Sequence, residues 1–152
     1  MRPVTRLAVV FCTIAFLGTG FSLDGAAAPA GPEITVFKDP QCGCCKLWVE
    51  YLRKHGYRVT VKDTSDLSGV NRVAGVGAAI SACHTAFVNG YVIEGHVPVE
   101  DIERLLREKP KVAGLAVPGM PVGSPGMEGG TPQHYVVLSF QRSGETQVFA
   151  RH

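Results

Sequence analysis

The spacing of hydrophobic residues along this chain predicts short strands that alternate with amphipathic helices. Residues 34–37 form a β-branched and aromatic run that ends at Asp39-Pro40, which is typical of a buried strand. From Cys45 the hydrophobic positions follow helical spacing up to a stop at Gly56, and residues 57–61 then predict a second strand. Because the connections are short, we expect these two strands to be parallel neighbours joined by a right-handed crossover.

The same pattern continues through the middle of the chain. Residues 66–73 are a helix candidate that begins with a capping residue, and residues 85–88 and 91–94 are β-prone segments. Asn89-Gly90 between these two segments is the strongest two-residue signal for a β-hairpin. Pro98 then opens a helix with acidic residues in its first turn. The predicted order is β-α-β-α-β-β-α, which indicates an α/β fold.

A region rich in glycine and proline follows, over residues 111–134. It contains Met120 and Met127, each in the local sequence Pro-Gly-Met, and the initiator is the only other methionine of the chain. Since a structureless segment of this length is uncommon in a compact domain, we expect it to be functional or disordered. Residues 135–140 and 146–150 predict a closing β-hairpin that holds the far end of this region against the rest.

The N-terminal segment, residues 1–30, differs in composition from the remainder. Arg2 and Arg6 precede a hydrophobic stretch over residues 7–20, and Ala28-Pro29-Ala30 ends a run of small residues. This is the layout of a secretory signal peptide with its cleavage site, so we expect the segment to be removed after export. The hydrophobic stretch is short and interrupted, so no stable membrane insertion is expected after cleavage.

Charge and cysteine content narrow the function classes. Cleavage removes two arginines and one aspartate and leaves a net charge of +1, with no stripe of lysine or arginine to neutralise phosphates. We therefore expect no nucleic-acid partner. Cleavage also removes Cys12. The four remaining cysteines are Cys42, Cys44, Cys45 and Cys83. An even number of cysteines in an exported protein normally indicates structural disulfides, but the first three of these are too close together to join distant parts of the chain.

The three clustered cysteines lie between the first predicted strand and the first predicted helix, in the sequence Cys42-Gly43-Cys44-Cys45. Unpaired backbone N–H groups and the positive end of the helix dipole at such a position favour the thiolate, which attacks disulfides and binds soft metals. The motif therefore predicts sulfur chemistry, either electron transfer through a disulfide or metal capture.

The cysteines and the two later methionines together form a set of soft ligands. Soft sulfur donors select Cu(I), and to a lesser degree zinc or iron–sulfur clusters. Structural zinc sites normally take two spaced pairs of ligands and do not recruit methionine, which favours copper. Adjacent thiolates are suited to bridging several ions, so we expect more than one copper ion. The predicted metal ligands are Cys42, Cys44, Cys45, Cys83, Met120 and Met127.

Two segments resemble the thioredoxin and glutaredoxin fold. Residues 36–45 are similar to a glutaredoxin active-site turn. Residues 81–90 are similar to the segment that carries a cis-proline facing the thiol pair, with His84 in place of the proline. The resemblance implies that Cys83 faces the other three thiols. The predicted parts of the chain are a cleaved signal peptide at residues 1–30, a thioredoxin/glutaredoxin-like domain at residues 31–110, and a metal-site extension with a β-hairpin at residues 111–152.

A wider set of motifs covers the chain beyond the signal peptide: Cys42-Gly43-Cys44-Cys45, residues 81–85, the Gly/Pro/Met-rich residues 114–128 and the terminal residues 148–152. In this order they resemble the CopG-type proteins of bacterial copper resistance. The resemblance implies a periplasmic copper protein in which cysteines bridge the copper, with a role in interconverting Cu(I) and Cu(II) as a copper oxidoreductase. Copper ions and periplasmic copper efflux components are the expected partners.

A thiol–disulfide oxidoreductase is the alternative function, with Cys42 as the exposed nucleophile and Cys45 as the resolving thiol. Cys44 has no role in that alternative and favours the metal. Passive copper buffering or delivery is a third function that the ligand set does not separate from redox turnover. The roles at the site of four further residues stay open at the level of the sequence: His84, His96, His134 and Glu128.

Overall fold

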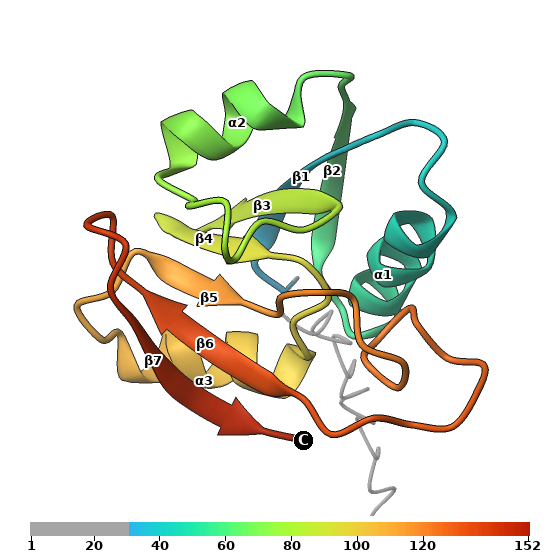
Figure 1. Ribbon diagram of the computed structural model, residues 1–152. Coiled ribbons are helices and arrows are strands. Elements are labelled where there is room, and N and C mark those ends of the chain that lie inside the picture. The colour runs from blue at the N-terminus through green and yellow to red at the C-terminus, as the bar shows by residue number, and fades with distance from the viewer. Residues whose placement is uncertain (1–30) are drawn as a thin grey trace, which may run out of the picture.

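A mixed sheet of seven strands runs through residues 31–152, which are the residues that this computed structural model describes (Figure 1). The strand order is β2-β1-β3-β4-β5-β6-β7. The predicted signal peptide at residues 1–30 lies outside the described residues. The helices and strands are β1 (Glu33–Lys38), α1 (Gly43–Lys54), β2 (Arg58–Asp63), α2 (Leu67–Ala74), β3 (His84–Val88), β4 (Tyr91–Glu94), α3 (Val99–Glu108), β5 (Gly114–Ala116), β6 (Val136–Phe140) and β7 (Thr146–Arg151).

The helices cover both faces of this sheet. Hydrophobic residues of α1 and α3 pack against one face, where Trp48, Leu52 and Ile102 are fully buried. Ala74 of α2 packs against the other face, in a second cluster that includes Phe140 of β6. Burial of a side chain such as Leu52 contributes about 1.5–3 kcal/mol. This packing fixes α1, and with it the cysteine turn from which the helix starts.

The order β-α-β-α-β-β-α predicted from hydrophobic spacing is confirmed over residues 33–108, and the fold is mixed α/β. β1 and β2 are parallel, with Val36 opposite Val61. β3 and β4 form an antiparallel hairpin around Asn89-Gly90, where both turn residues have positive φ. β6 and β7 also pair antiparallel, as the predicted closing hairpin.

The expectation that residues 111–134 hold no regular structure is wrong for β5. This strand pairs parallel with β4 and antiparallel with β6. Glycine is required at its first residue, Gly114, because a Cβ there would overlap the carbonyl group of Val92 on β4. The sheet is therefore continuous from β4 to the closing hairpin, and residues 117–135 form the irregular part of the extension. The division of the chain after residue 110 stays a prediction.

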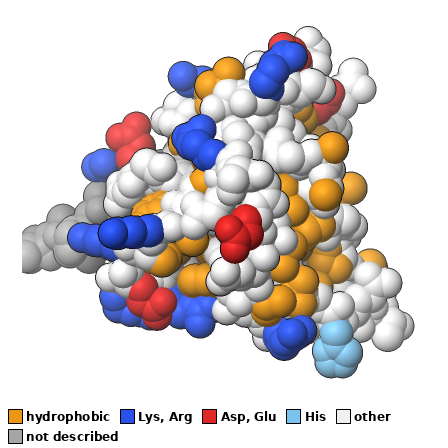
Figure 2. All heavy atoms as spheres, turned by 60° about the vertical axis from the view of Figure 1, so that its left-hand side comes forward, with side chains coloured by type: hydrophobic (Ala, Val, Ile, Leu, Met, Phe, Trp, Pro, Cys, Tyr) orange, Lys and Arg blue, Asp and Glu red, His pale blue; other side chains and the backbone are white. Residues whose placement is uncertain are grey.

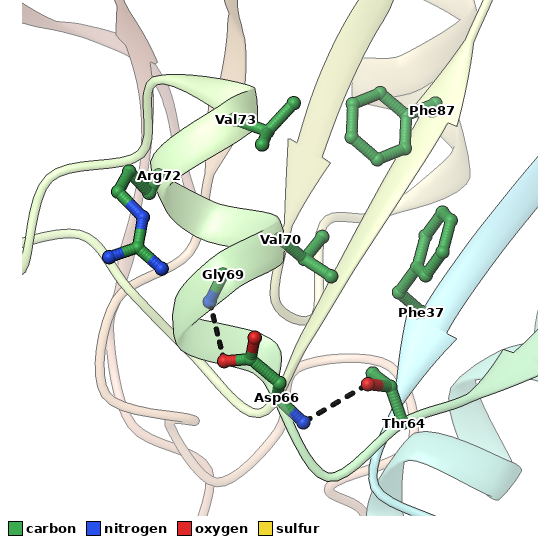
Figure 3. A pocket seen from close by; sticks show the side chains of 8 residues that line it. All are labelled: Phe37, Thr64, Asp66, Gly69, Val70, Arg72, Val73 and Phe87. Carbon is green, nitrogen blue, oxygen red and sulfur yellow. Dashed lines mark hydrogen bonds between the residues drawn. The ribbon is translucent and has the colours of Figure 1, made fainter.

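Hydrophobic side chains lie between scattered charged ones on the face drawn in Figure 2. Val73 of α2 is 78% exposed and lines a groove of about 530 Å³ against β1 and β3, together with Phe37 and Phe87 (Figure 3). The polar end of this groove is occupied by the start of α2, where Asp66 accepts a hydrogen bond from the backbone N–H of Gly69 at 2.8 Å. None of the four cysteines within residues 31–152 lines the groove.

Within residues 31–152, no helix combines the length and the hydrophobicity that a membrane span requires.

Candidate metal centre

Cys42 is the residue that starts helix α1. Its backbone has φ −67° and ψ 104°, and its sulfur accepts a hydrogen bond from the backbone N–H of Cys45 at 3.3 Å. This N-cap lets α1 begin at Gly43, two residues before the start that hydrophobic spacing predicts. Cys44 and Cys45 therefore lie in the first helical turn, where unpaired N–H groups and the helix dipole favour negatively charged sulfur.

Four cysteine sulfurs meet at this helix start. Cys83 lies in the loop before β3, and its sulfur is 3.9 Å from the sulfur of Cys44. The Cys44 sulfur is in turn 3.4 Å from that of Cys42, and the Cys45 sulfur is 3.3 Å from the carbonyl oxygen of Cys83. The four sulfurs all lie within 4.8 Å of one another. The structure thus brings together the C-x-C-C turn and a cysteine from a distant loop.

Two of these sulfurs are joined. Cys42 and Cys45 form a disulfide, whereas Cys44 and Cys83 are free thiols. Reduction of the disulfide frees two further thiolates, so the number of sulfur ligands available at this place depends on the redox state. The same pair is the nucleophile and resolving thiol of the alternative oxidoreductase function.

The Cys83 thiol is perturbed by its surroundings. Burial, and after it the neighbouring Cys44 sulfur, raise the pKa of Cys83 to about 12. The thiol therefore keeps its proton near neutral pH. A soft cation bound here would take the place of that proton, because the thiolate is the form that binds metals.

Two buried histidines lie beside Cys83. Nδ1 of His84 is 3.5 Å and Nε2 of His96 is 3.3 Å from its sulfur. The ring of Trp48 stacks on His84 with a centroid distance of 4.3 Å. Burial lowers the pKa of His84 to about 3, and burial lowers the pKa of His96 as well. Both imidazoles are therefore neutral at pH 7, and each has a ring nitrogen with a free lone pair.

The second Pro-Gly-Met repeat, residues 125–127, packs the extension against this site. The loop after β5 passes α1 there (Figure 1). Gly126 packs so closely that an added Cβ would lie 2.8 Å from the backbone nitrogen of Trp48 and 3.0 Å from the carbonyl oxygen of Cys44. The carbonyl oxygen of Pro125 accepts a hydrogen bond from Nδ1 of His96 at 2.7 Å. The extension therefore contacts both the helix start and a histidine beside Cys83.

The two predicted methionine ligands differ in their settings. Met127 follows Gly126 directly and is partly buried. Met120 belongs to the first repeat, has a positive φ of 48° and is 38% exposed. Glu128, whose role the sequence leaves open, accepts a hydrogen bond from the backbone N–H of Gly126 at 2.9 Å and so shapes the second repeat. His134 is exposed.

A buried carboxyl group lies on the strand next to the Cys83 loop. One oxygen of Glu94 accepts a hydrogen bond from the backbone N–H of Ala82 at 2.6 Å, and the other is buried with no hydrogen-bond partner among residues 31–152. Burial raises the pKa of Glu94 to about 7. The Glu94 carboxyl group therefore gains or loses its proton near neutral pH. Its hydrogen-bond donor, Ala82, is the residue that precedes Cys83.

His96 is the residue at the site that hydrophobic and motif patterns do not single out. The register of the β3–β4 hairpin nevertheless indicates that His96 lies near Cys83. The register of β3 and β4 places Thr85 opposite Glu94, and two further steps along the same register place Cys83 opposite His96. Because a two-residue Asn-Gly turn fixes the register of its hairpin, this neighbourhood follows from the sequence alone.

Two solved structures are similar to this chain over most of its length. Both are described as copper resistance protein CopG, in form 2 and form 1. Each is 44% identical to this chain, with a match that covers 80% of this chain and 98% of the other, and the TM-scores are 0.76 and 0.75. Residues 80–127 also match the family described as "Protein of unknown function, DUF411". Comparison with curated protein sequences finds no match.

Proposed function

This chain belongs to the family of the copper resistance protein CopG, and we propose that it is a copper-binding protein of copper resistance. The observation that carries the proposal is the meeting of four cysteine sulfurs within 4.8 Å. Soft sulfur ligands favour Cu(I) over the ions that prefer oxygen. The proposed ligands are Cys42, Cys44, Cys45 and Cys83, with Met120 and Met127 as thioether ligands from the extension.

The distances between the sulfurs support metal binding. Two thiolates on one tetrahedral ion lie about 3.8 Å apart when each metal–sulfur bond is about 2.3 Å, as at zinc. The sulfurs of Cys44 and Cys83 are 3.9 Å apart, so an ion fits between them with little movement. Cys44 is also 3.4 Å from the sulfur of Cys42. A thiolate with sulfur neighbours on two sides is suited to bridging, and we propose that more than one copper ion binds.

The redox part of the proposal uses the Cys42–Cys45 pair. When these two thiols form their disulfide, they release two electrons and two protons, and two Cu(II) ions take one electron each to become Cu(I). Cys44 and Cys83 stay reduced, and each releases its thiol proton to hold the Cu(I) product as a thiolate. In the reverse direction the disulfide takes two electrons from two Cu(I) ions and two protons from water.

Copper stoichiometry tests the proposal. Protein that is reduced and loaded with Cu(I) without oxygen is expected to keep more than one copper ion per chain after desalting. Cys44→Ser is expected to lose most of this copper. Lys46→Ser changes an exposed residue of the same helical turn and is the matched control, which should keep the wild-type stoichiometry. Unchanged stoichiometry in Cys44→Ser contradicts the proposal.

The place of action in this proposal is the periplasm, after export by the predicted signal peptide, and periplasmic copper efflux components are the proposed partners. Cell fractionation and N-terminal sequencing test the export. The expected product begins after Ala30 and is recovered from the periplasmic fraction. Recovery of the unprocessed chain from the cytoplasm contradicts this part of the proposal.

The Cys42–Cys45 disulfide favours a second candidate function, a thiol–disulfide oxidoreductase. Cys42 is partly exposed and Cys45 is fully buried, which suits an attacking and a resolving thiol respectively. This function predicts that Cys44→Ser, Met120→Leu and Met127→Leu keep full reductase activity and that Cys42→Ser abolishes it. A wild-type protein without insulin- or glutathione-linked activity excludes it.

A further inference from the structure

We propose that residues 118–134 form a lid over the cysteine cluster, which swings on its two ends and opens to admit copper complexes larger than a bare ion. The identity of the ligand rests on the function proposed above. The hydrogen bonds and the packing that define the lid do not depend on that function. In Figure 1 the lid is the loop that joins β5 to β6 and passes the start of α1.

Both ends of the lid are fixed in the sheet. β5 and β6 are antiparallel neighbours, with Ala116 opposite Leu138, so the two ends lie side by side. At one end the backbone N–H of Val117 donates a hydrogen bond to β4 at 3.0 Å. At the other end Tyr135 exchanges two backbone hydrogen bonds with His152, at 3.1 Å and 2.9 Å. The segment between these ends can therefore swing without disturbing the sheet.

The lid is held together by hydrogen bonds within itself. The backbone N–H of Ser124 donates to the carbonyl oxygen of Pro121 at 3.1 Å, and that of Met127 donates to the carbonyl oxygen of Ser124 at 2.8 Å. The backbone N–H of Gln133 donates to the carbonyl oxygen of Val122 at 2.9 Å and ties the later part of the lid to the earlier part. A loop whose hydrogen bonds close on themselves moves as one unit instead of unravelling.

Few contacts join the lid to the rest of the protein. Within residues 31–152, a single hydrogen bond links residues 118–134 to the other elements, from Nδ1 of His96 to the carbonyl oxygen of Pro125 at 2.7 Å. Ser124 and Gly126 are the buried residues of the lid, whereas residues 128–134 are all exposed. Segments with few buried contacts open at low cost in free energy. Opening of the lid breaks only this small contact.

The contact lies beside the thiols. Gly126 packs against backbone atoms of Cys44 and Trp48 in the first turns of α1. Cys44 and Cys83 are free thiols that keep partial exposure. A small ligand therefore reaches these two sulfurs with the lid closed, whereas a bulky ligand needs the space that the lid occupies. Loops that close over a site in this way control which ligands enter it.

Two maleimides of different size test the lid on metal-free protein with the Cys42–Cys45 disulfide intact. Gly126→Ala crowds the backbone of α1 and lifts the lid. It is expected to speed the reaction of a polyethylene glycol maleimide with the free thiols about tenfold, and that of N-ethylmaleimide by less than about twofold, because only the larger reagent needs the open state. Gly119→Ala adds a Cβ that meets nothing within 4 Å and is the matched control, which should change neither rate.

A measurement on the wild-type protein covers the case in which Gly126→Ala fails to fold. Relative to N-ethylmaleimide, the polyethylene glycol maleimide is expected to react about tenfold more slowly with the folded protein than with protein unfolded in urea. Equal relative rates in the folded and unfolded protein overturn the proposal. So does a folded Gly126→Ala variant that speeds both reagents alike or leaves the rate of the larger one unchanged.

The lid and the proposed function fail in different ways. If the maleimide rates contradict the lid while reduced protein keeps its Cu(I), only the lid is wrong. If the maleimide rates are as expected while reduced protein does not keep Cu(I), the proposed function is wrong.

Discussion

Substitution of Gly126 by alanine perturbs the contact between the extension and the metal centre. The added Cβ would lie 2.8 Å from the nitrogen of Trp48 and 3.0 Å from the carbonyl oxygen of Cys44, and both are backbone atoms of α1. Since a helix backbone yields little, the strain is relieved by movement of the extension. Gly126→Ala should therefore lift the second Pro-Gly-Met repeat from the start of α1.

Gly119 provides a matched control, because it has the same place in the first Pro-Gly-Met repeat. Its φ is +78°, close to the +83° of Gly126, but an added Cβ would meet nothing within 4 Å. An alanine in the left-handed region costs about 1–2 kcal/mol, and both variants bear this cost. Overpacking against fixed neighbours costs about a further 1–3 kcal/mol, which falls on Gly126→Ala alone.

Urea unfolding of the metal-free protein measures these costs, and competition with a chromophoric Cu(I) chelator measures copper affinity. We expect Gly126→Ala to be less stable than Gly119→Ala by about 1–3 kcal/mol. We also expect it to bind copper about tenfold more weakly, a difference of about 1.4 kcal/mol, because Met127 moves with the repeat. Equal stability and equal copper affinity in the two variants would show that the close contact of Gly126 with α1 does not hold the extension in place.

Three further substitutions test the fold around the site. Burial raises the pKa of Glu94 to about 7, so the folded state holds this proton more tightly than the unfolded state. Wild-type protein should therefore lose up to about 3 kcal/mol of stability relative to Glu94→Gln as the pH rises from about 4.5 to about 7, and parallel pH profiles in urea unfolding would contradict this. Asp63→Asn should cost about 1.5–3 kcal/mol in the same assay, because it weakens the 2.7 Å ion pair of the buried Lys38; a loss below about 0.5 kcal/mol would show that the pair contributes little. Leu52→Ala should lower the free energy of unfolding by about 2–5 kcal/mol, because Leu52 is fully buried. Leu47 is 50% exposed on the same helix, so Leu47→Ala should lower it far less. Similar losses in the two variants would contradict the assignment of Leu52 to the core.

Elements with strong local signals were predictable from the sequence. Asn89-Gly90 specifies its hairpin because both residues accept positive φ, of 46° and 86°. Asp66 marks the start of α2 because its carboxylate caps the N–H of Gly69. β5 lacks any such signal, since it has three residues and owes its existence to hydrogen bonds with β4 and β6. A strand defined only by its neighbours is not visible in a local pattern.

The candidate site, like the fold, has features that the sequence predicts and features that it does not. The C-x-C-C cluster is visible in the sequence, and the approach of Cys83 follows from the pairing of β3 with β1, where His84 lies opposite Lys38. The contact between Pro125 and His96 was beyond prediction, because it depends on the path of residues 117–135 through space. His96 itself could have been identified from the register of the β3–β4 hairpin, which places it opposite Cys83. Strand register therefore identifies neighbours that motif spacing alone does not.

Copper is proposed to bind where the cysteine turn of α1 meets Cys83. The most direct measurement is a crystal structure of the reduced, copper-loaded protein with anomalous scattering recorded at the copper edge. Copper peaks are expected about 2.3 Å from the sulfurs of Cys44 and Cys83. Copper bound only at exposed residues, with the Cys83 sulfur unliganded, would contradict the claim.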